Sequence, residues 1–114
     1  MNYKEERPWG WFEILFEETS LKIKRILVKP GKRLSLQSHE RRAENWVVIQ
    51  GQALFTLDEK TFSLGPRQAV FIPEKTKHRM DNPGQENLVF VEVQTGTYLG
   101  EDDITRFQDD FDRC

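Results

Sequence analysis

The sequence predicts an all-β protein, a sandwich or small barrel built from many short strands. Turn-forming residues recur about every ten residues along the 114-residue chain. The segments between these turns are short and rich in Val, Ile, Leu, Phe and Thr, which favour extended structure. No stretch before residue 100 shows apolar residues at the spacing of a helix, so the pattern does not indicate a helical protein.

Six apolar segments are the expected strands, and Gly, Pro, Asn and Asp separate them at the turns. In chain order the strands are "LKIKRILV" (21–28), "NWVVIQ" (45–50), "ALFTL" (53–57), "TFSL" (61–64), "AVFI" (69–72) and "NLVFVEV" (87–93). The turns are "RPWG" (7–10), "KPGK" (29–32), "QGQ" (50–52), "LDEK" (57–60), "LGP" (64–66), "DNPGQEN" (81–87) and "QTG" (94–96). The closing segment 101–113 is expected to form a short helix or an arm.

Two of these strands, "WVVI" and "LVFVEV", are apolar on both faces. We therefore expect their inner face to line a cavity and their outer face to pack on a partner, by default in a homodimer. The length fits one domain, 1–114. The formal net charge of −2 provides no basic field that would recruit nucleic acid or a membrane. The chain lacks an apolar leader and its one cysteine is Cys114, so we expect a cytoplasmic protein.

The chemistry-bearing residues cluster around "LSLQSHERRAENW" (34–46). On a strand, residues two apart share a face, so Gln37 and His39 point the same way. Glu44, Trp46 and Val48 form a second such set, which a bend between the two runs would bring beside the first. His78 is the only other histidine in the chain, and it is expected at the start of a new strand after the "IP" corner.

The spacing of these residues resembles the two signatures of the cupin superfamily. The matching positions are Gly31, Gln37, His39, Glu44 and Gly51 in the first signature, and Gly65, Pro73, His78 and Asn82 in the second. Gln37 replaces the usual first histidine, and Lys75 replaces a usual glycine. The resemblance implies a double-stranded β-helix (jelly-roll) barrel that binds one divalent metal through Gln37, His39, Glu44 and His78.

Nearly the whole chain is similar to a narrower group, the C-terminal domain of type II phosphomannose isomerases. The similar stretches are "RPWGWFE", "KPGKRLSLQSHERRAENWVVIQGQA", "VFIPEKTKHRMDNPG" and "FVEVQTGTYLGEDDITRFQDDFDR". The resemblance implies a metal-dependent isomerase that interconverts mannose 6-phosphate and fructose 6-phosphate, feeding GDP-mannose and polysaccharide synthesis. Members commonly carry histidine where this chain has Arg41 and Asn45.

Such a reaction needs a Lewis acid on the substrate oxygens and a base that moves a proton between two carbons. Zn²⁺, Co²⁺, Mn²⁺, Ni²⁺ and Fe²⁺ all suit the ligand set. We expect Lys75 and Arg42 to serve as catalytic residues. Arg42 and Arg79 are the candidates for binding the substrate phosphate, because the guanidinium fork fits phosphate oxygens.

Two other functions remain open at this point. One is a non-catalytic sugar-binding or regulatory cupin that partners a separate guanylyltransferase, which Arg41 and Asn45 favour because they replace histidines. The other is a different cupin enzyme such as a dioxygenase. Gln37 argues against that enzyme, because oxygen-activating cupins more often use three histidines.

Overall fold

The computed structural model describes residues 2–111, which form eleven strands and no helix. Cys114, which partly supported the expected cytoplasmic location, lies outside these residues. Residues 2–111 thus contain no helix that could cross a membrane. The strands are β1 (Tyr3–Arg7), β2 (Gly10–Glu18), β3 (Leu21–Val28), β4 (Leu36–Ser38), β5 (Arg42–Gln50), β6 (Ala53–Leu57), β7 (Lys60–Leu64), β8 (Ala69–Ile72), β9 (His78–Asp81), β10 (Leu88–Gly96) and β11 (Thr105–Gln108).

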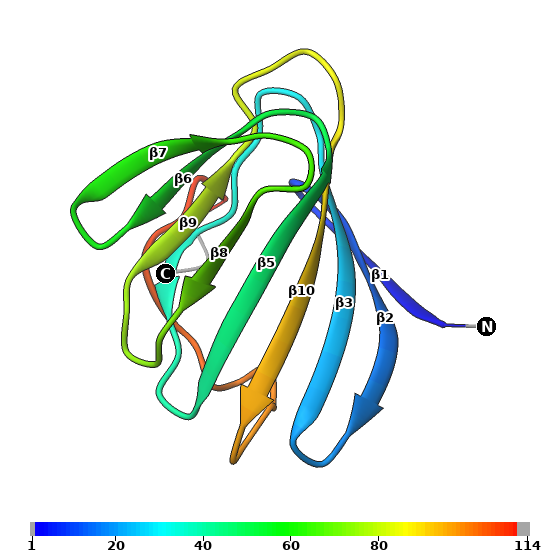
Figure 1. Cartoon of the computed structure of the whole chain (residues 1–114), viewed down its shortest axis with the longest axis vertical. Coiled ribbons are helices and arrows are strands. Elements are labelled where there is room, and N and C mark those ends of the chain that lie inside the picture. Colours follow the sequence, from blue (N-terminus) through cyan, green and yellow to red (C-terminus); the bar gives the residue numbers. More distant parts are fainter. Residues whose placement is uncertain (1, 112–114) are drawn as a thin grey trace.

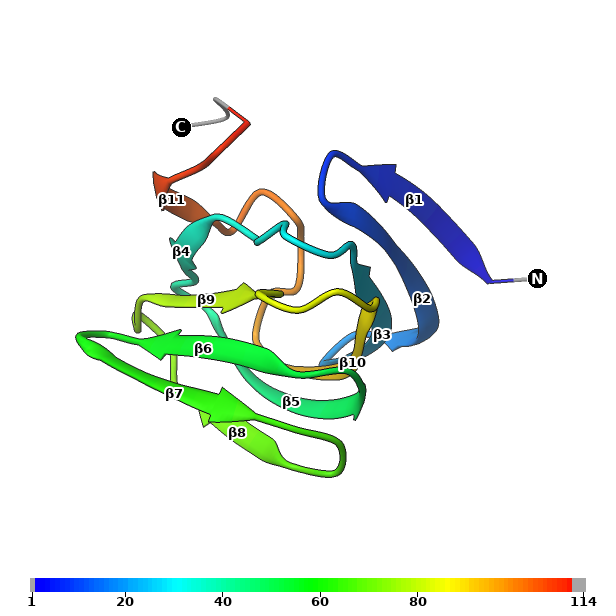
Figure 2. The ribbon, with the colours of Figure 1, turned by 90° about the horizontal axis from the view of Figure 1, so that it is seen from above.

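The strands form two antiparallel sheets that face each other across the core (Figures 1 and 2). The six-stranded sheet has the order β1-β2-β3-β10-β5-β8, and the five-stranded sheet has the order β11-β4-β9-β6-β7. The chain crosses between the sheets repeatedly, so strands that are distant in sequence become neighbours. The all-β jelly-roll fold that the sequence predicted is therefore confirmed.

The predicted strands coincide closely with the observed ones, and four observed strands, β1, β2, β4 and β11, were not predicted. β3, β6 and β8 have the predicted bounds, whereas β5 begins three residues earlier than expected, at Arg42. The tail is an arm rather than a helix, since β11 pairs with the edge of β4 (Figure 2). That pairing satisfies backbone groups that β4 would otherwise leave exposed.

The interior changes from apolar to polar along three neighbouring strands. The buried residues of β10 run from Leu88 and Phe90 to Glu92 and Gln94. On β3, the partners of Phe90, Glu92 and Gln94 are Ile26, Lys24 and Lys22. On β5, the partners of the same three residues are Val48, Trp46 and Glu44. Because the register aligns these residues, the barrel has one apolar end and one polar end.

Trp46 joins the two ends. Its ring packs on Phe90 and edge-on against Phe55, at centroid distances of 4.8 and 5.5 Å. It also lies edge-on to the His78 ring at 5.3 Å, and its indole Nε1–H donates to Glu44. The indole therefore buries its apolar surface in the core while its polar atom faces the functional groups.

Candidate metal centre

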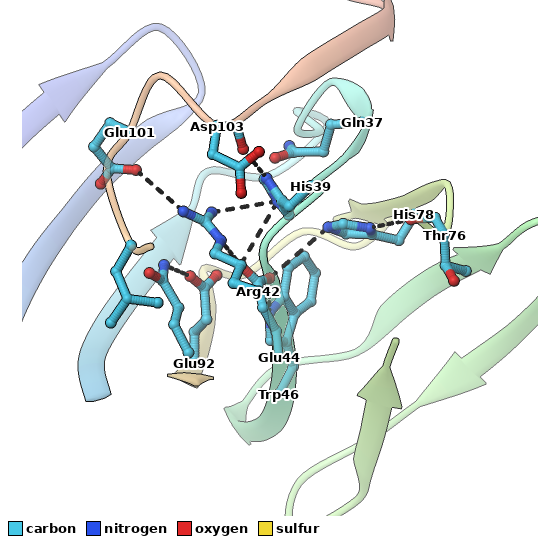
Figure 3. Close-up of polar contacts among 12 residues, drawn as sticks. Gln37, His39, Arg42, Glu44, Trp46, Thr76, His78, Glu92, Glu101 and Asp103 are labelled. Carbon is cyan, nitrogen blue, oxygen red and sulfur yellow. Dashed lines mark hydrogen bonds and ion pairs between the residues drawn. The ribbon is translucent and has the colours of Figure 1, made fainter. Parts of the chain in front are cut away.

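Three buried side chains from different segments converge at the polar end of the barrel (Figure 3). His39 lies in the bend after β4, Glu44 lies on β5, and His78 begins β9. Their nearest ligand atoms all lie within 4.8 Å of one another. The bend that the sequence predicted between Gln37 and Glu44 carries the chain from one sheet to the other, which brings Glu44 beside the histidines.

Both histidines present an unprotonated Nε2 to this cluster. His39 Nδ1–H donates to the carbonyl oxygen of Asp103 at 2.7 Å, and His78 Nδ1–H donates to that of Thr76 at 2.9 Å. Since a carbonyl only accepts, the proton of each neutral ring sits on Nδ1. Burial lowers the pKa of both rings to about 4, and the nearby positive charge of Arg42 adds to the effect. Both rings are therefore neutral near pH 7.

Two hydrogen-bond donors hold the Glu44 carboxylate in place. Arg42 Nε donates to Oε2 at 2.7 Å, and Trp46 Nε1 donates to Oε1 at 2.9 Å. Burial raises the pKa of the Glu44 carboxyl, while the charge of Arg42 opposes that rise. Arg42 Nη2 also lies 3.3 Å from His39 Nε2, so one guanidinium contacts two members of the cluster.

The cluster fits a divalent cation by donor chemistry and by spacing. Two ligands that are about 2.1 Å from a shared ion lie roughly 3 to 4.2 Å apart. His39 Nε2 and Glu44 Oε2 are 3.6 Å apart, and His78 Nε2 and Glu44 Oε1 are 3.8 Å apart. Within the described part of the chain, His78 Nε2 is buried with no hydrogen-bond partner. Buried polar atoms normally have a hydrogen-bond partner. The lone pair of this nitrogen accepts no hydrogen bond, so it is available to coordinate an ion.

Gln37, the predicted fourth ligand, lies beside this cluster on β4. Its Cα pairs directly with that of His78 across β4 and β9, and its side chain lines the same cavity as Glu44. Its Nε2 donates to the carbonyl and hydroxyl oxygens of Ser35, at 3.3 and 3.1 Å. The amide Oε1 is thus the atom that Gln37 has available for an ion.

A cavity of about 100 Å³ opens beside the cluster, and charged groups of both signs line it. Its cationic residues come from four separate segments, and they are Arg7, Lys24, Arg42 and Arg106. Its acidic residues are Glu44, Glu92 and Glu101. Trp9 and Phe12 form part of the apolar wall. A polar, part-aromatic cavity of this kind suits a small polar ligand that carries negative charge.

The other residues predicted to contact substrate lie outside this cavity. Lys75 is exposed, and its backbone N–H donates to the His39 carbonyl oxygen at 2.6 Å. Its φ of 63° is in the left-handed region that favours glycine, which explains why glycine is usual at this position. Arg79 is buried on β9, where its guanidinium donates to the Leu34 carbonyl oxygen and to Gln108.

The two positions where histidine is usual also point away from the cluster. Arg41 is exposed and its guanidinium lies over the Tyr98 ring, 5.4 Å from the centroid. Asn45 is exposed and, one residue from Glu44, faces the opposite side of β5. Neither side chain can therefore ligate an ion held by Glu44.

Sequence reasoning missed four polar residues that complete this end of the barrel. They are Lys24, Glu92, Glu101 and Asp103. The alternation of Lys22, Lys24, Glu92 and Gln94 with apolar residues was the available signal, because it places charged side chains on the buried face of two strands. The loop residues Glu101 and Asp103 gave no comparable signal.

One family matches almost the whole chain: the family described as Mannose-6-phosphate isomerase C-terminal covers residues 1–109. The chain is 49% identical over 107 residues to the alginate biosynthesis protein AlgA of Pseudomonas aeruginosa, which is 94% of this chain and 22% of AlgA. It is 46% identical over 110 residues to the xanthan biosynthesis protein XanB of Xanthomonas campestris, which is 96% of this chain and 24% of XanB. It is 43% identical over 108 residues to a mannose-1-phosphate guanylyltransferase of Klebsiella pneumoniae, which is 95% of this chain and 23% of that protein.

Solved structures share the fold at low sequence identity. The capsular polysaccharide assembling protein CapF of Staphylococcus aureus superposes with a TM-score of 0.84 and 14% identity, over 95% of this chain and 33% of that chain. The cupin domain of Schizosaccharomyces pombe Cnp3 gives 0.70 and 16%, over 75% and 64% of the two chains. A double-stranded β-helix protein from Klebsiella pneumoniae gives 0.74 and 19%, over 82% and 80%. These likenesses support the cupin fold alone.

The relatives correct the predicted function. The prediction of a metal-dependent isomerase that interconverts mannose 6-phosphate and fructose 6-phosphate is wrong for this chain. The chain spans less than a quarter of the curated relatives it matches, and the enzyme named among them is a guanylyltransferase. The chain thus corresponds to one segment of longer proteins, among them a guanylyltransferase, and the non-catalytic alternative fits that relation better.

Proposed function

The chain belongs to the Mannose-6-phosphate isomerase C-terminal family, and on that premise we propose that it is a non-catalytic, sugar-binding cupin module that partners a guanylyltransferase. Its role would lie in the synthesis of mannose-containing polysaccharide. The proposal rests on the similarity to AlgA, XanB and the guanylyltransferase. In each of these proteins the chain matches one segment, which makes up 22 to 24% of that protein's length.

The groups that isomerisation would require are engaged in other contacts, which supports a binding role. Glu44 accepts hydrogen bonds from Arg42 and Trp46, and as a ligand of the proposed cation it would be a weakened base. Lys75 is exposed and is not among the residues that line the cavity. A general base must reach the proton it removes, and Lys75 does not meet that condition because it lies outside the cavity.

The cavity supports a sugar as the ligand. Ser35, Gln37 and Glu92 provide hydrogen-bonding atoms at its wall, and Trp9 adds an aromatic surface. We propose that His39, Glu44 and His78, with Gln37 as fourth ligand, hold one divalent cation beside this wall. The cation would provide a fixed positive charge for sugar oxygens. Arg42, which contacts both His39 and Glu44, would orient those two ligands.

The outer face of the six-stranded sheet supports the proposed interaction with a guanylyltransferase. An antiparallel sheet with one solvated face is expected to be polar on that face. Here the outward residues of β5, β8 and β10 are mostly apolar, and they include Val47, Ile49, Phe71, Val91 and Val93. Ile49 and Phe71 are 54% and 55% exposed. We propose that this face, named here the outer apolar face, packs on the guanylyltransferase.

Calorimetric titration and a coupled assay on the same preparation test the binding role. Mannose 6-phosphate is titrated into the protein, with mannose and inorganic phosphate as comparison ligands. Formation of fructose 6-phosphate is then followed with and without a chelator. We expect saturable binding of mannose 6-phosphate without turnover above the protein-free rate. Chelator-sensitive turnover that His39→Ala abolishes would contradict the proposal, as would the absence of any binding.

A further inference from the structure

The carboxylate of Glu101 lies against two buried cationic side chains at the cavity. Glu101 forms an ion pair and a hydrogen bond with Lys24 Nζ, and its Oε2 lies 3.8 Å from Arg42 Nη1 (Figure 3 shows the Arg42 contact). The side chains of Lys24 and Arg42 are 6% and 5% exposed, whereas that of Glu101 is 46% exposed. Two buried cations thus share one carboxylate that comes from a surface loop.

The carboxylate leaves part of this cationic pair unsatisfied. Arg42 Nη1 is buried and has no hydrogen-bond partner among the described residues. Its 3.8 Å separation from Glu101 Oε2 is too long for a hydrogen bond. A buried guanidinium nitrogen without an acceptor is costly, so a ligand that supplies an acceptor there gains binding free energy.

We infer that Lys24 and Arg42 form an anion site for a phosphate monoester, which Glu101 fills until the phosphate of a ligand displaces it. This inference rests on the proposed sugar-binding function, because it names the ligand class that the same cavity takes. A phosphate monoester carries about two charges near pH 7 and three acceptor oxygens, against one charge and two oxygens for a carboxylate. It can therefore contact Lys24 Nζ and Arg42 Nη1 together.

The neighbouring contacts would let Glu101 leave without unfolding the loop. Before it in the chain, the Leu99 carbonyl oxygen accepts from the buried Lys22 Nζ at 2.9 Å. After it, the carboxylate of Asp103 accepts from the backbone N–H groups of Glu40 and Arg41, each at 3.0 Å. Because the loop is anchored on both sides, displacement needs only rotation of the exposed Glu101 side chain.

Competition between Glu101 and the ligand predicts the direction of three substitutions. Glu101→Gln removes the competing charge at nearly constant size, and we expect inorganic phosphate and mannose 6-phosphate to bind about tenfold more tightly. Lys24→Met removes one cation, and we expect about tenfold weaker binding. In the double variant, Glu101→Gln should tighten binding less than it does in the wild-type background, because one of the two cations for which Glu101 and the ligand compete is gone. Glu86→Gln, an exposed change of the same charge, is the matched control and should leave affinity unchanged.

The affinities are measured by calorimetry at constant ionic strength, with circular dichroism to verify folding of each variant. Equal affinity of wild type and Glu101→Gln for both probes would overturn the inference. Tightening of the same size in Glu86→Gln or in the double variant would also overturn it, since net charge alone would then explain the effect. If inorganic phosphate follows the predicted pattern but mannose 6-phosphate binds no better than phosphate, the anion site stands and the sugar-binding proposal fails.

Discussion

At the scale of single residues, the polar end of the barrel depends on Glu44. Its buried carboxylate accepts from Arg42 and Trp46 and lies within 4 Å of both histidine Nε2 atoms, at 3.6 and 3.8 Å. Because an unpaired buried charge costs several kcal/mol, the hydrogen bonds from Arg42 and Trp46 compensate part of the burial of the carboxylate, whereas the unprotonated Nε2 atoms offer it no donor. The same geometry makes Glu44 the one anionic ligand of the proposed metal centre.

Binding of a divalent ion can be measured by the visible absorption of Co²⁺. We expect one Co²⁺ per chain, and at least about tenfold weaker binding in Glu44→Gln because the anionic ligand is lost. Glu92→Gln is the matched control, since Glu92 is equally buried but bonds to Gln94. Co²⁺ that binds equally well to Glu44→Gln and to wild type would refute the proposed ligand set.

The two histidines predict how stability depends on pH in the presence of a chelator. Their folded-state pKa of about 4 lies below the ordinary value of 6.5, so the unfolded chain binds more protons between these values. The contribution of these rings to the free energy of unfolding is therefore fully present above pH 6.5. It falls by roughly 3 kcal/mol per ring as the pH drops toward 4.

Urea unfolding at pH 7 and pH 4.5 measures this loss. The variant with both His39→Gln and His78→Gln should lose clearly less stability between the two pH values than wild type does. The raised pKa values of Glu44 and Glu92, which burial causes, act in the opposite direction and are common to both proteins. An identical loss in the two proteins would show that the rings are not buried as neutral groups.

The sequence predicted this residue cluster only in part. Local alternation and one bend were enough to bring His39 and Glu44 together, and the cupin-like spacing added His78. The pair of Lys24 and Glu101 was beyond such rules, because the two residues are 77 positions apart and only the closed fold brings them together. Arg79 looked like a substrate contact because it follows His78, but alternation on β9 turns it toward β11 instead.

At the scale of elements, Arg79 fastens the C-terminal arm to the five-stranded sheet. It donates from β9 to the carbonyl oxygen of Leu34, which precedes β4, and to that of Gln108 on β11. We expect Arg79→Met to lower the free energy of unfolding by about 2 kcal/mol, because two carbonyl groups lose a charged donor. Amide hydrogen exchange in β11 should also become faster.

Arg25→Met provides the comparison for that substitution. Arg25 is exposed and its one ion pair, with Glu13, is long at 3.9 Å, so stability should change by less than about 0.5 kcal/mol. Equal effects of the two substitutions, or unchanged exchange in β11, would contradict the role given to Arg79.

The elements that the sequence predicted well are those whose pattern does not depend on a distant partner. β3, β6 and β8 are dense in β-branched and aromatic residues and are bounded by turns. β4 has only three residues, and its pairing with β9 is a single register pair, Gln37 with His78. β11 is a short, mostly polar segment with acidic residues before and after it in the sequence. It becomes a strand because the edge of β4 is available for pairing.

At the scale of the whole molecule, the outer apolar face predicts where a partner packs. We expect Ile49→Asp to weaken binding of a guanylyltransferase fragment, such as the Klebsiella pneumoniae guanylyltransferase without the matched segment, by at least about tenfold in analytical ultracentrifugation. Folding should be unaffected, because Ile49 is 54% exposed. Lys60→Asp, at an exposed position of β7 on the other sheet, is the control.

Self-association is the alternative that this experiment distinguishes. A second copy of the chain on the outer apolar face would give the homodimer that the sequence suggested, and Ile49→Asp would then dissociate that dimer. Wild-type protein that neither binds the guanylyltransferase fragment nor pairs with itself would refute a partner at this face.

The central claim, that the polar end of the barrel binds a sugar phosphate without converting it, is tested most directly by one carbon NMR experiment. Mannose 6-phosphate labelled with ¹³C at C1 and C2 is incubated with the metal-loaded protein, so that one spectrum reports both binding and chemistry. We predict broadened or shifted mannose signals and no fructose 6-phosphate signals after prolonged incubation. Fructose 6-phosphate signals that grow with time, or mannose signals identical to those without protein, would contradict the account.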